Sequence, residues 1–64
     1  MIVNGEEKQF DDVVNILGLL SALNLEMDRV VVEVNKNIIA KDIYESFPLK
    51  EDDVIEIVGF VGGG

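Results

Sequence analysis

The C-terminal residues Gly62, Gly63 and Gly64 are the part of this 64-residue chain best suited to covalent chemistry. Glycine has no Cβ atom, so a run of glycines can thread a narrow channel and bring its backbone close to another molecule. The α-carboxylate that follows, with a reference pKa of about 3.3–3.7, is ionised at neutral pH. It can act as a nucleophile if a partner supplies an electrophile. The alternative is a flexible end without a function.

The other residues offer little catalytic chemistry. The chain contains no Cys and no His, which removes the usual thiol nucleophile, the commonest general base and the commonest metal ligands. Ser21 lies in an apolar stretch with no His or Lys arranged near it in sequence. The acidic pairs and runs at 11–12 and 51–53 lack the spacing of a calcium loop and are typical of solvated turns. We therefore expect no catalytic residue, no metal and no bound cofactor.

The charge balance narrows the choice of partners. Thirteen acidic residues against five basic ones give a net charge of −8, which argues against nucleic-acid binding and favours a basic protein surface. The longest uncharged run, residues 13–25, is too short to cross a bilayer, and no basic segment marks it as a signal peptide. Without cysteines, a domain this small is expected in the cytoplasm, away from membranes and monomeric when free.

The first third of the chain predicts a hairpin and a helix. Asn4-Gly5 is typical of a two-residue type I′ turn between an opening strand and a return strand at residues 7–10. Ile16, Leu19, Leu20 and Leu23 share one helical face, with Asn15 suited to the N-cap and Asn24 to a left-handed C-terminal cap.

The remainder predicts strands at residues 30–35, 38–40 and 54–58. In the first of them Val30, Val32 and Val34 share one face, which indicates a core side. The last is expected to be central and buried, with Val54 or Ile55 leading its inward set. Tyr44 and Phe47 are expected to form a satellite of the core. One helix on a mixed sheet of four or five strands defines an α+β, two-layer architecture. We expect one domain over residues 1–64 with a flexible tail at 59–64. Phe60 either covers the sheet edge or anchors a partner.

Three segments together resemble the ThiS family of sulfur carrier proteins in thiamine biosynthesis. They are Asn4-Gly5-Glu6 after the opening strand, Val32-Glu33-Val34-Asn35, and the run from Asp53 through Val58 to Phe60-Val61-Gly62-Gly63-Gly64. The similarity extends over essentially the whole chain. The chain departs from the family at Gly18 and in the turns at 35–37 and 50–53, which lack a frequent glycine.

The resemblance implies a ubiquitin-like β-grasp fold and a carrier that is not itself an enzyme. A ThiF-like adenylyltransferase would use ATP to adenylate the Gly64 carboxylate, which would then become a thiocarboxylate and donate sulfur to a ThiG-like thiazole synthase. Gly62 and Gly63 would occupy the partner's channel, and Phe60 and Val61 would contact the partner's surface.

Three alternatives remain open from the sequence. The small subunit of molybdopterin synthase shares the β-grasp fold and the terminal Gly-Gly, although it is usually longer. A ubiquitin-like modifier would end on a lysine of another protein. A plain interaction module would use apolar surface and negative charge, with an idle glycine tail.

Overall fold

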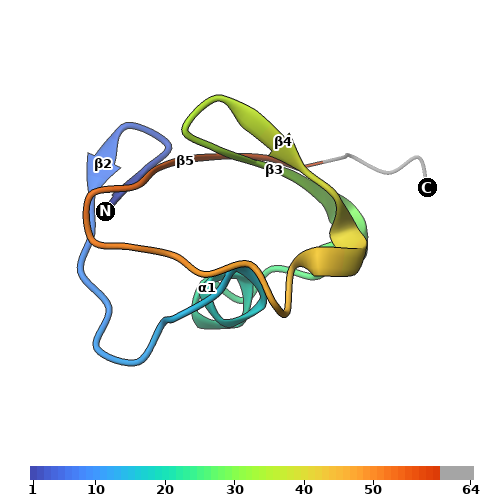
Figure 1. Cartoon of the computed structure of the whole chain (residues 1–64), viewed down its shortest axis with the longest axis horizontal. Coiled ribbons are helices and arrows are strands. Elements are labelled where there is room, and N and C mark those ends of the chain that lie inside the picture. The colour runs from blue at the N-terminus through green and yellow to red at the C-terminus, as the bar shows by residue number, and fades with distance from the viewer. Residues whose placement is uncertain (60–64) are drawn as a thin grey trace.

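A computed structural model describes residues 1–59, which form a mixed five-stranded sheet with one α-helix across one face (Figure 1). The strand order in the sheet is β2-β1-β5-β3-β4. In chain order the elements are β1 (Ile2–Val3), β2 (Glu6–Glu7), α1 (Ile16–Ala22), the 3-10 helix η1 (Met27–Arg29), β3 (Val30–Val34), β4 (Asn37–Ile39), the 3-10 helix η2 (Lys41–Ile43) and β5 (Val54–Gly59). The α+β class predicted from the sequence is confirmed.

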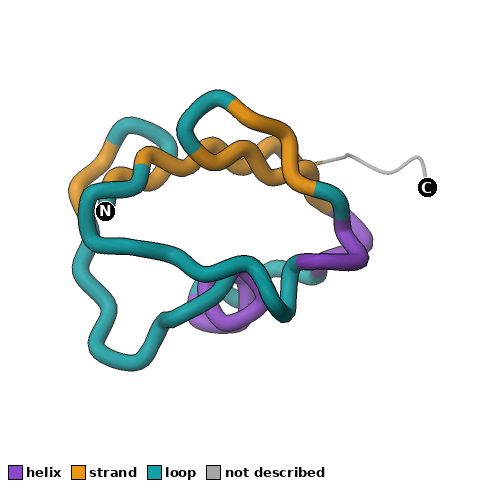
Figure 2. The backbone as a smooth tube through the Cα atoms, in the orientation of Figure 1, coloured by secondary structure: helices purple, strands orange, loops and turns teal. Residues whose placement is uncertain are grey.

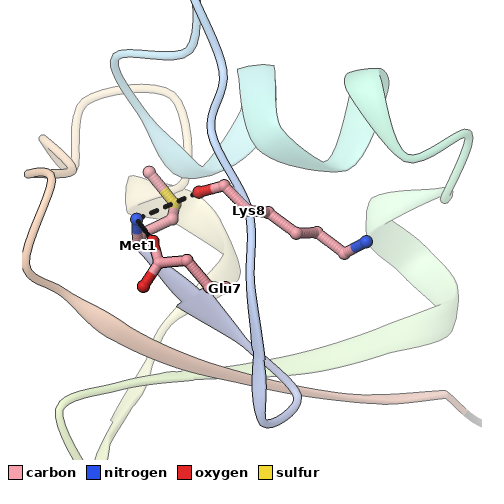
Figure 3. A network of polar contacts seen from close by, with 3 residues as sticks. All are labelled: Met1, Glu7 and Lys8. Carbon is pink, nitrogen blue, oxygen red and sulfur yellow. Dashed lines mark hydrogen bonds and ion pairs between the residues drawn. The ribbon is translucent and has the colours of Figure 1, made fainter.

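The N-terminal hairpin turns at Asn4 and Gly5, as predicted. Both residues have positive φ, 51° and 84°, which a type I′ turn requires. The return strand is shorter than the predicted 7–10, because β1 offers only two residues for pairing. Beyond it, the Lys8 N–H still donates to the Met1 carbonyl at 2.9 Å. The Met1 amino group in turn donates to Glu7 Oε2 and to the Lys8 carbonyl, both at 3.1 Å (Figure 3).

The helix α1 has the two caps that the sequence predicts. The Oδ1 atom of Asn15 accepts a hydrogen bond from the Gly18 N–H at 2.7 Å. At the other end, Asn24 adopts φ of 60°, and the Leu25 N–H donates to the Leu20 carbonyl at 2.8 Å. The Asn24 N–H also donates to the Ser21 carbonyl, and these two hydrogen bonds together form a Schellman motif. The caps fix both ends of a helix of only seven residues.

The second hairpin, β3–β4, packs one face of alternating valines into the core. Val30, Val32 and Val34 are buried, as predicted. The strands join through Asn35 and Lys36, which both have positive φ, 51° and 72°. The second strand begins at Asn37, one residue earlier than predicted, because a two-residue turn pairs Asn37 with Val34.

The last strand, β5, lies at the centre of the sheet, parallel to β1 and antiparallel to β3. The prediction of a central strand is confirmed, but the prediction that the strand is buried holds for only one face. Ile55 is fully buried and leads the inward set, whereas Val54 and Val58 are 43% and 58% exposed on the other face. Gly59, predicted to belong to the tail, is the last residue of β5 and pairs with Val30.

The core lies between the sheet and α1 (Figure 1) and is closed by the connection from β4 to β5, largely loop (Figure 2). Tyr44 in this connection is 1% exposed and belongs to the main core, so the prediction of a satellite position is wrong. The connection runs alongside the start of α1 and is held there by two hydrogen bonds. The Leu17 N–H donates to the Tyr44 carbonyl, and the Leu49 N–H donates to the Val14 carbonyl. Phe47 packs against the core and is partly buried.

Candidate functional site

The strand β5 ends at Gly59, the last residue that the structure describes. The last two ladder pairs are Val31 with Val58 and Val30 with Gly59, so β5 stays paired with β3 up to the last described residue. The predicted site residues Phe60, Val61, Gly62, Gly63 and Gly64 lie outside the described residues. Five residues reach at most roughly 17–18 Å when fully extended, which sets the range of the Gly64 carboxylate from the sheet.

The first turn of the chain fixes the middle of β5. The Asn4 N–H donates to the Ile55 carbonyl at 2.9 Å, and the Asn4 side-chain oxygen accepts from the Ile57 N–H at 2.7 Å. The side chain of Asn4 therefore continues the β1–β5 ladder beyond the end of β1. Asn4 therefore has a role beyond the turn, because its side chain also provides a hydrogen-bond acceptor for β5.

The start of β5 is fixed by a buried carboxylate. Asp53 is 7% exposed, and its Oδ1 accepts from the Asn35 side-chain amide at 2.9 Å. Its Oδ2 accepts from the Lys50 N–H at 2.8 Å. The Asn35 side-chain oxygen accepts from the Val54 N–H, and the Asn35 N–H donates to the Val54 carbonyl. These contacts tie the β3–β4 turn to the beginning of the central strand.

Sequence reasoning missed this role of Asp53, which it placed in a solvated acidic turn. The partner amide is eighteen residues away, and only the register between β3 and β5 brings the two together. The available signal was the pair of polar residues flanking two valine-rich strands, Asn35 after β3 and Asp53 before β5. Antiparallel strands place such positions at the same end of the sheet.

The face of the sheet away from α1 carries exposed apolar side chains. Val58 and Ile38 are 58% and 71% exposed, and Val31 beside Val58 is partly exposed. Glu33 and Glu56 lie on the same face, directly opposite each other on β3 and β5. The exit of β5 is therefore bordered by a surface that is apolar and acidic together.

The described residues hold neither a metal-binding cluster nor a membrane-spanning helix. Over residues 1–59, no three side chains of His, Cys, Asp or Glu come together as a metal site would require. Ser21 is exposed on α1. No helix within the same range has the length and apolar character needed to cross a membrane.

A mixed sheet in the order β2-β1-β5-β3-β4 with a single helix on one face defines a β-grasp protein, here with a segment ending in three glycines after the central strand. The model of the ThiS family matches residues 1–64. The chain belongs to the ThiS family.

Known proteins resemble the chain over its whole length. The sulfur carrier protein ThiS of Bacillus subtilis is 46% identical over 63 residues, 97% of this chain and 96% of that protein. A crystal structure of a thiamine biosynthesis protein (ThiS) from Geobacter metallireducens superposes with a TM-score of 0.82 at 32% identity, covering 98% of this chain and 96% of that one. The β-grasp fold expected from the resemblance is confirmed.

Two relatives are much longer than this chain. Thiazole synthases of Paramagnetospirillum magneticum and Magnetococcus marinus are 36% and 39% identical to it over 64 and 62 residues. The match covers 100% and 97% of this chain but only 20% and 19% of those proteins. The chain thus spans about a fifth of their length, so these thiazole synthases contain a ThiS-like segment.

Proposed function

We propose that the chain is a sulfur carrier protein of thiamine biosynthesis, acted on by partner enzymes and not itself catalytic. The observation that carries this proposal is the 46% identity, over nearly the full length of both chains, to the protein named sulfur carrier protein ThiS. The Gly62-Gly63-Gly64 end after a central strand supplies the group that such a carrier needs.

The chemistry proceeds at the Gly64 carboxylate. A carboxylate oxygen attacks the α-phosphorus of ATP on a ThiF-like adenylyltransferase, pyrophosphate leaves, and an acyl-adenylate forms. Sulfur at the oxidation level of sulfide, as hydrosulfide, then attacks the activated carbonyl carbon, AMP leaves and the sulfur loses its proton, which gives the thiocarboxylate. ATP is bound and used by the partner, so the carrier requires no Cys, no His, no metal and no cofactor of its own.

The thiocarboxylate then donates its sulfur to a ThiG-like thiazole synthase. The two thiazole synthases that contain a ThiS-like segment support this partner, since both functions occur there in one chain. The same observation favours the thiamine pathway over the molybdopterin pathway. Gly62 and Gly63 thread the partner's channel, while Phe60 and Val61 contact its surface.

The proposal is tested by ATP–pyrophosphate exchange with the adenylyltransferase from the same cell, followed by mass spectrometry of the carrier. Exchange that depends on the carrier, and a mass increase equal to the difference between sulfur and oxygen, are the expected results. A carrier isolated only as a lysine conjugate would instead establish a protein modifier. A bare carboxylate under all conditions, without exchange, would leave an interaction module.

A further inference from the structure

Two carboxylates face each other on the exposed side of the sheet. Glu33 on β3 and Glu56 on β5 are direct cross-strand partners in the ladder. Directly opposite residues on one face have Cβ atoms about 4.5–5.5 Å apart, and like charges in this arrangement are destabilising. Within residues 1–59 the ion pairs join Met1 with Glu7, Lys8 with Glu6 and Arg29 with Glu26, and none includes either carboxylate. None of these three ion pairs therefore offsets the repulsion between the two carboxylates.

The surroundings of the pair are apolar. Ile38 is the cross-strand neighbour of Glu33 on its other side, and Val54 and Val58 flank Glu56 along β5 on the same face. These three apolar side chains are 71%, 43% and 58% exposed. A protein that covers this face would remove the carboxylates from water, which is costly unless an opposite charge meets them. The face therefore restricts its partner to one with a cation at this point.

The geometry selects an arginine over other cations. The planar guanidinium group has five N–H donors and can hydrogen-bond to two carboxylates at once, and it keeps its charge when water is removed. A hard metal ion takes six to eight oxygen ligands, and no third acidic side chain joins this pair among residues 1–59. A guanidinium can instead lie between the two strands with its edges toward Glu33 and Glu56.

We propose that Glu33 and Glu56 jointly receive one arginine side chain of the thiazole synthase, with Ile38, Val54 and Val58 packing against apolar residues around it. This inference rests on the proposed function, which names that enzyme as the partner. The net charge of −8 attracts a basic surface from any direction. The carboxylate pair adds a specific register, because it defines one point on the sheet where the cation must lie.

The test compares binding of the full-length carrier and its variants to the separately purified thiazole synthase by calorimetry. The double variant Glu33→Gln with Glu56→Gln keeps the shape of the face and removes both charges. The matched control is Asp12→Asn with Glu45→Gln, two exposed residues outside the sheet that change the net charge equally. We expect the sheet variant to bind at least tenfold more weakly and the control to stay within about twofold of the wild type.

A charge reversal separates binding from folding. Glu56→Lys places a lysine opposite Glu33, so the free protein gains a cross-strand ion pair and should unfold at the same temperature as the wild type or higher. The same variant presents a positive charge to the proposed arginine and should lose binding. Equal affinity for the wild type, the double Gln variant and the reversal would overturn this inference alone. A wild-type carrier that does not bind thiazole synthase at all would overturn both this inference and the proposed partner.

Discussion

The side-chain amide of Asn35 donates a hydrogen bond to the buried carboxylate of Asp53 at 2.9 Å, across eighteen residues of sequence. The other end of the Asn35 side chain accepts from the Val54 N–H, also at 2.9 Å. The Asn35 side chain therefore hydrogen-bonds both to the Asp53 carboxylate, just before β5, and to Val54, the first residue of β5. This contact aligns the central strand with the β3–β4 hairpin.

The Asn35 side chain can be tested without disturbing the turn. Asn35→Gly keeps a residue that accepts φ of 51°, but removes both side-chain hydrogen bonds and leaves the Asp53 carboxylate partly unsatisfied. We expect a loss of about 1–3 kcal/mol in the free energy of unfolding, measured by urea denaturation. An unchanged midpoint and slope would show that the Asn35–Asp53 contact does not stabilise the fold.

Lys36, the next residue in the turn, provides a matched control in which substitution by glycine should stabilise the protein. Lys36 has φ of 72°, is exposed, and occupies a position that glycine fills without steric cost. Lys36→Gly should raise the free energy of unfolding by about 0.5–1 kcal/mol, after allowing for the greater freedom of glycine in the unfolded chain. For a domain of this size that corresponds to a higher melting temperature by roughly 2–8 °C. Destabilisation by this change would mean that Lys36 has a contact beyond its backbone conformation.

The glycine inside α1 is coupled to the cap of the helix. A Cβ atom at Gly18 would lie 3.2 Å from Asn15 Oδ1, close enough that the capping side chain must shift. Gly18→Ala should therefore stabilise the protein by clearly less than the approximately 1 kcal/mol that helix propensity alone would give. In the background of Asn15→Ala the same substitution should give the full gain, and a double-mutant cycle by thermal unfolding measures the difference. Identical gains in both backgrounds would contradict the coupling.

In the sequence Phe60 directly follows Gly59, the last residue of β5, and we expect it to contact the partner enzyme. Phe60→Ala should weaken binding to thiazole synthase mainly through faster dissociation, because an apolar anchor acts after encounter. Added salt should mainly slow association, because the charge of −8 steers the encounter. Surface plasmon resonance separates the two rates, with Val14→Ala, an exposed apolar residue before α1, as the control. Unchanged affinity for Phe60→Ala would assign Phe60 to local packing.

The length of the chain end is the most direct test of the proposed chemistry. Deleting Gly64 leaves an identical carboxylate on Gly63 but draws it back by about 3.3–3.6 Å. A reacting atom must lie about 3–3.5 Å from its target, so ATP–pyrophosphate exchange should be lost. The melting temperature should not change, because every core residue of the described chain precedes Gly59. An added Ala after Gly64 should also abolish exchange. Full exchange by either variant would refute the prediction that adenylation requires a chain end of this length.

Local signals in the sequence predicted the turns and caps correctly. Asn4-Gly5, Asn15 and Asn24 each have a side chain or backbone preference that acts within a few residues, so their positions could be inferred without the tertiary structure. The alternating valines of β3 likewise predicted which residues enter the core. The β-grasp fold came from the resemblance to the ThiS family, whereas the adenylation and thiocarboxylate chemistry that the resemblance implies for Gly64 stays a prediction.

The features that the sequence did not reveal depend on distant contacts. Tyr44 lies between polar and apolar residues without a helical or strand period, and it is buried because its segment crosses the start of α1. The role of Asp53 and the opposition of Glu33 and Glu56 both follow from the register of β5 against β3. The sequence of either strand by itself does not specify that register.

The parallel pairing of β1 with β5 has a mechanical consequence. Because the two strands run in the same direction, a pull between the start of β1 and the end of β5 slides them past each other. The hydrogen bonds between them then resist together, among them those from the Ile2 N–H to the Asp53 carbonyl, from the Asn4 N–H to the Ile55 carbonyl and from the Ile57 N–H to the Asn4 side chain. An antiparallel hairpin pulled at its two ends would instead open one bond at a time. A pull between Met1 and Gly59 therefore loads these bonds at the same time, so the two ends of the described chain are held together against such a force.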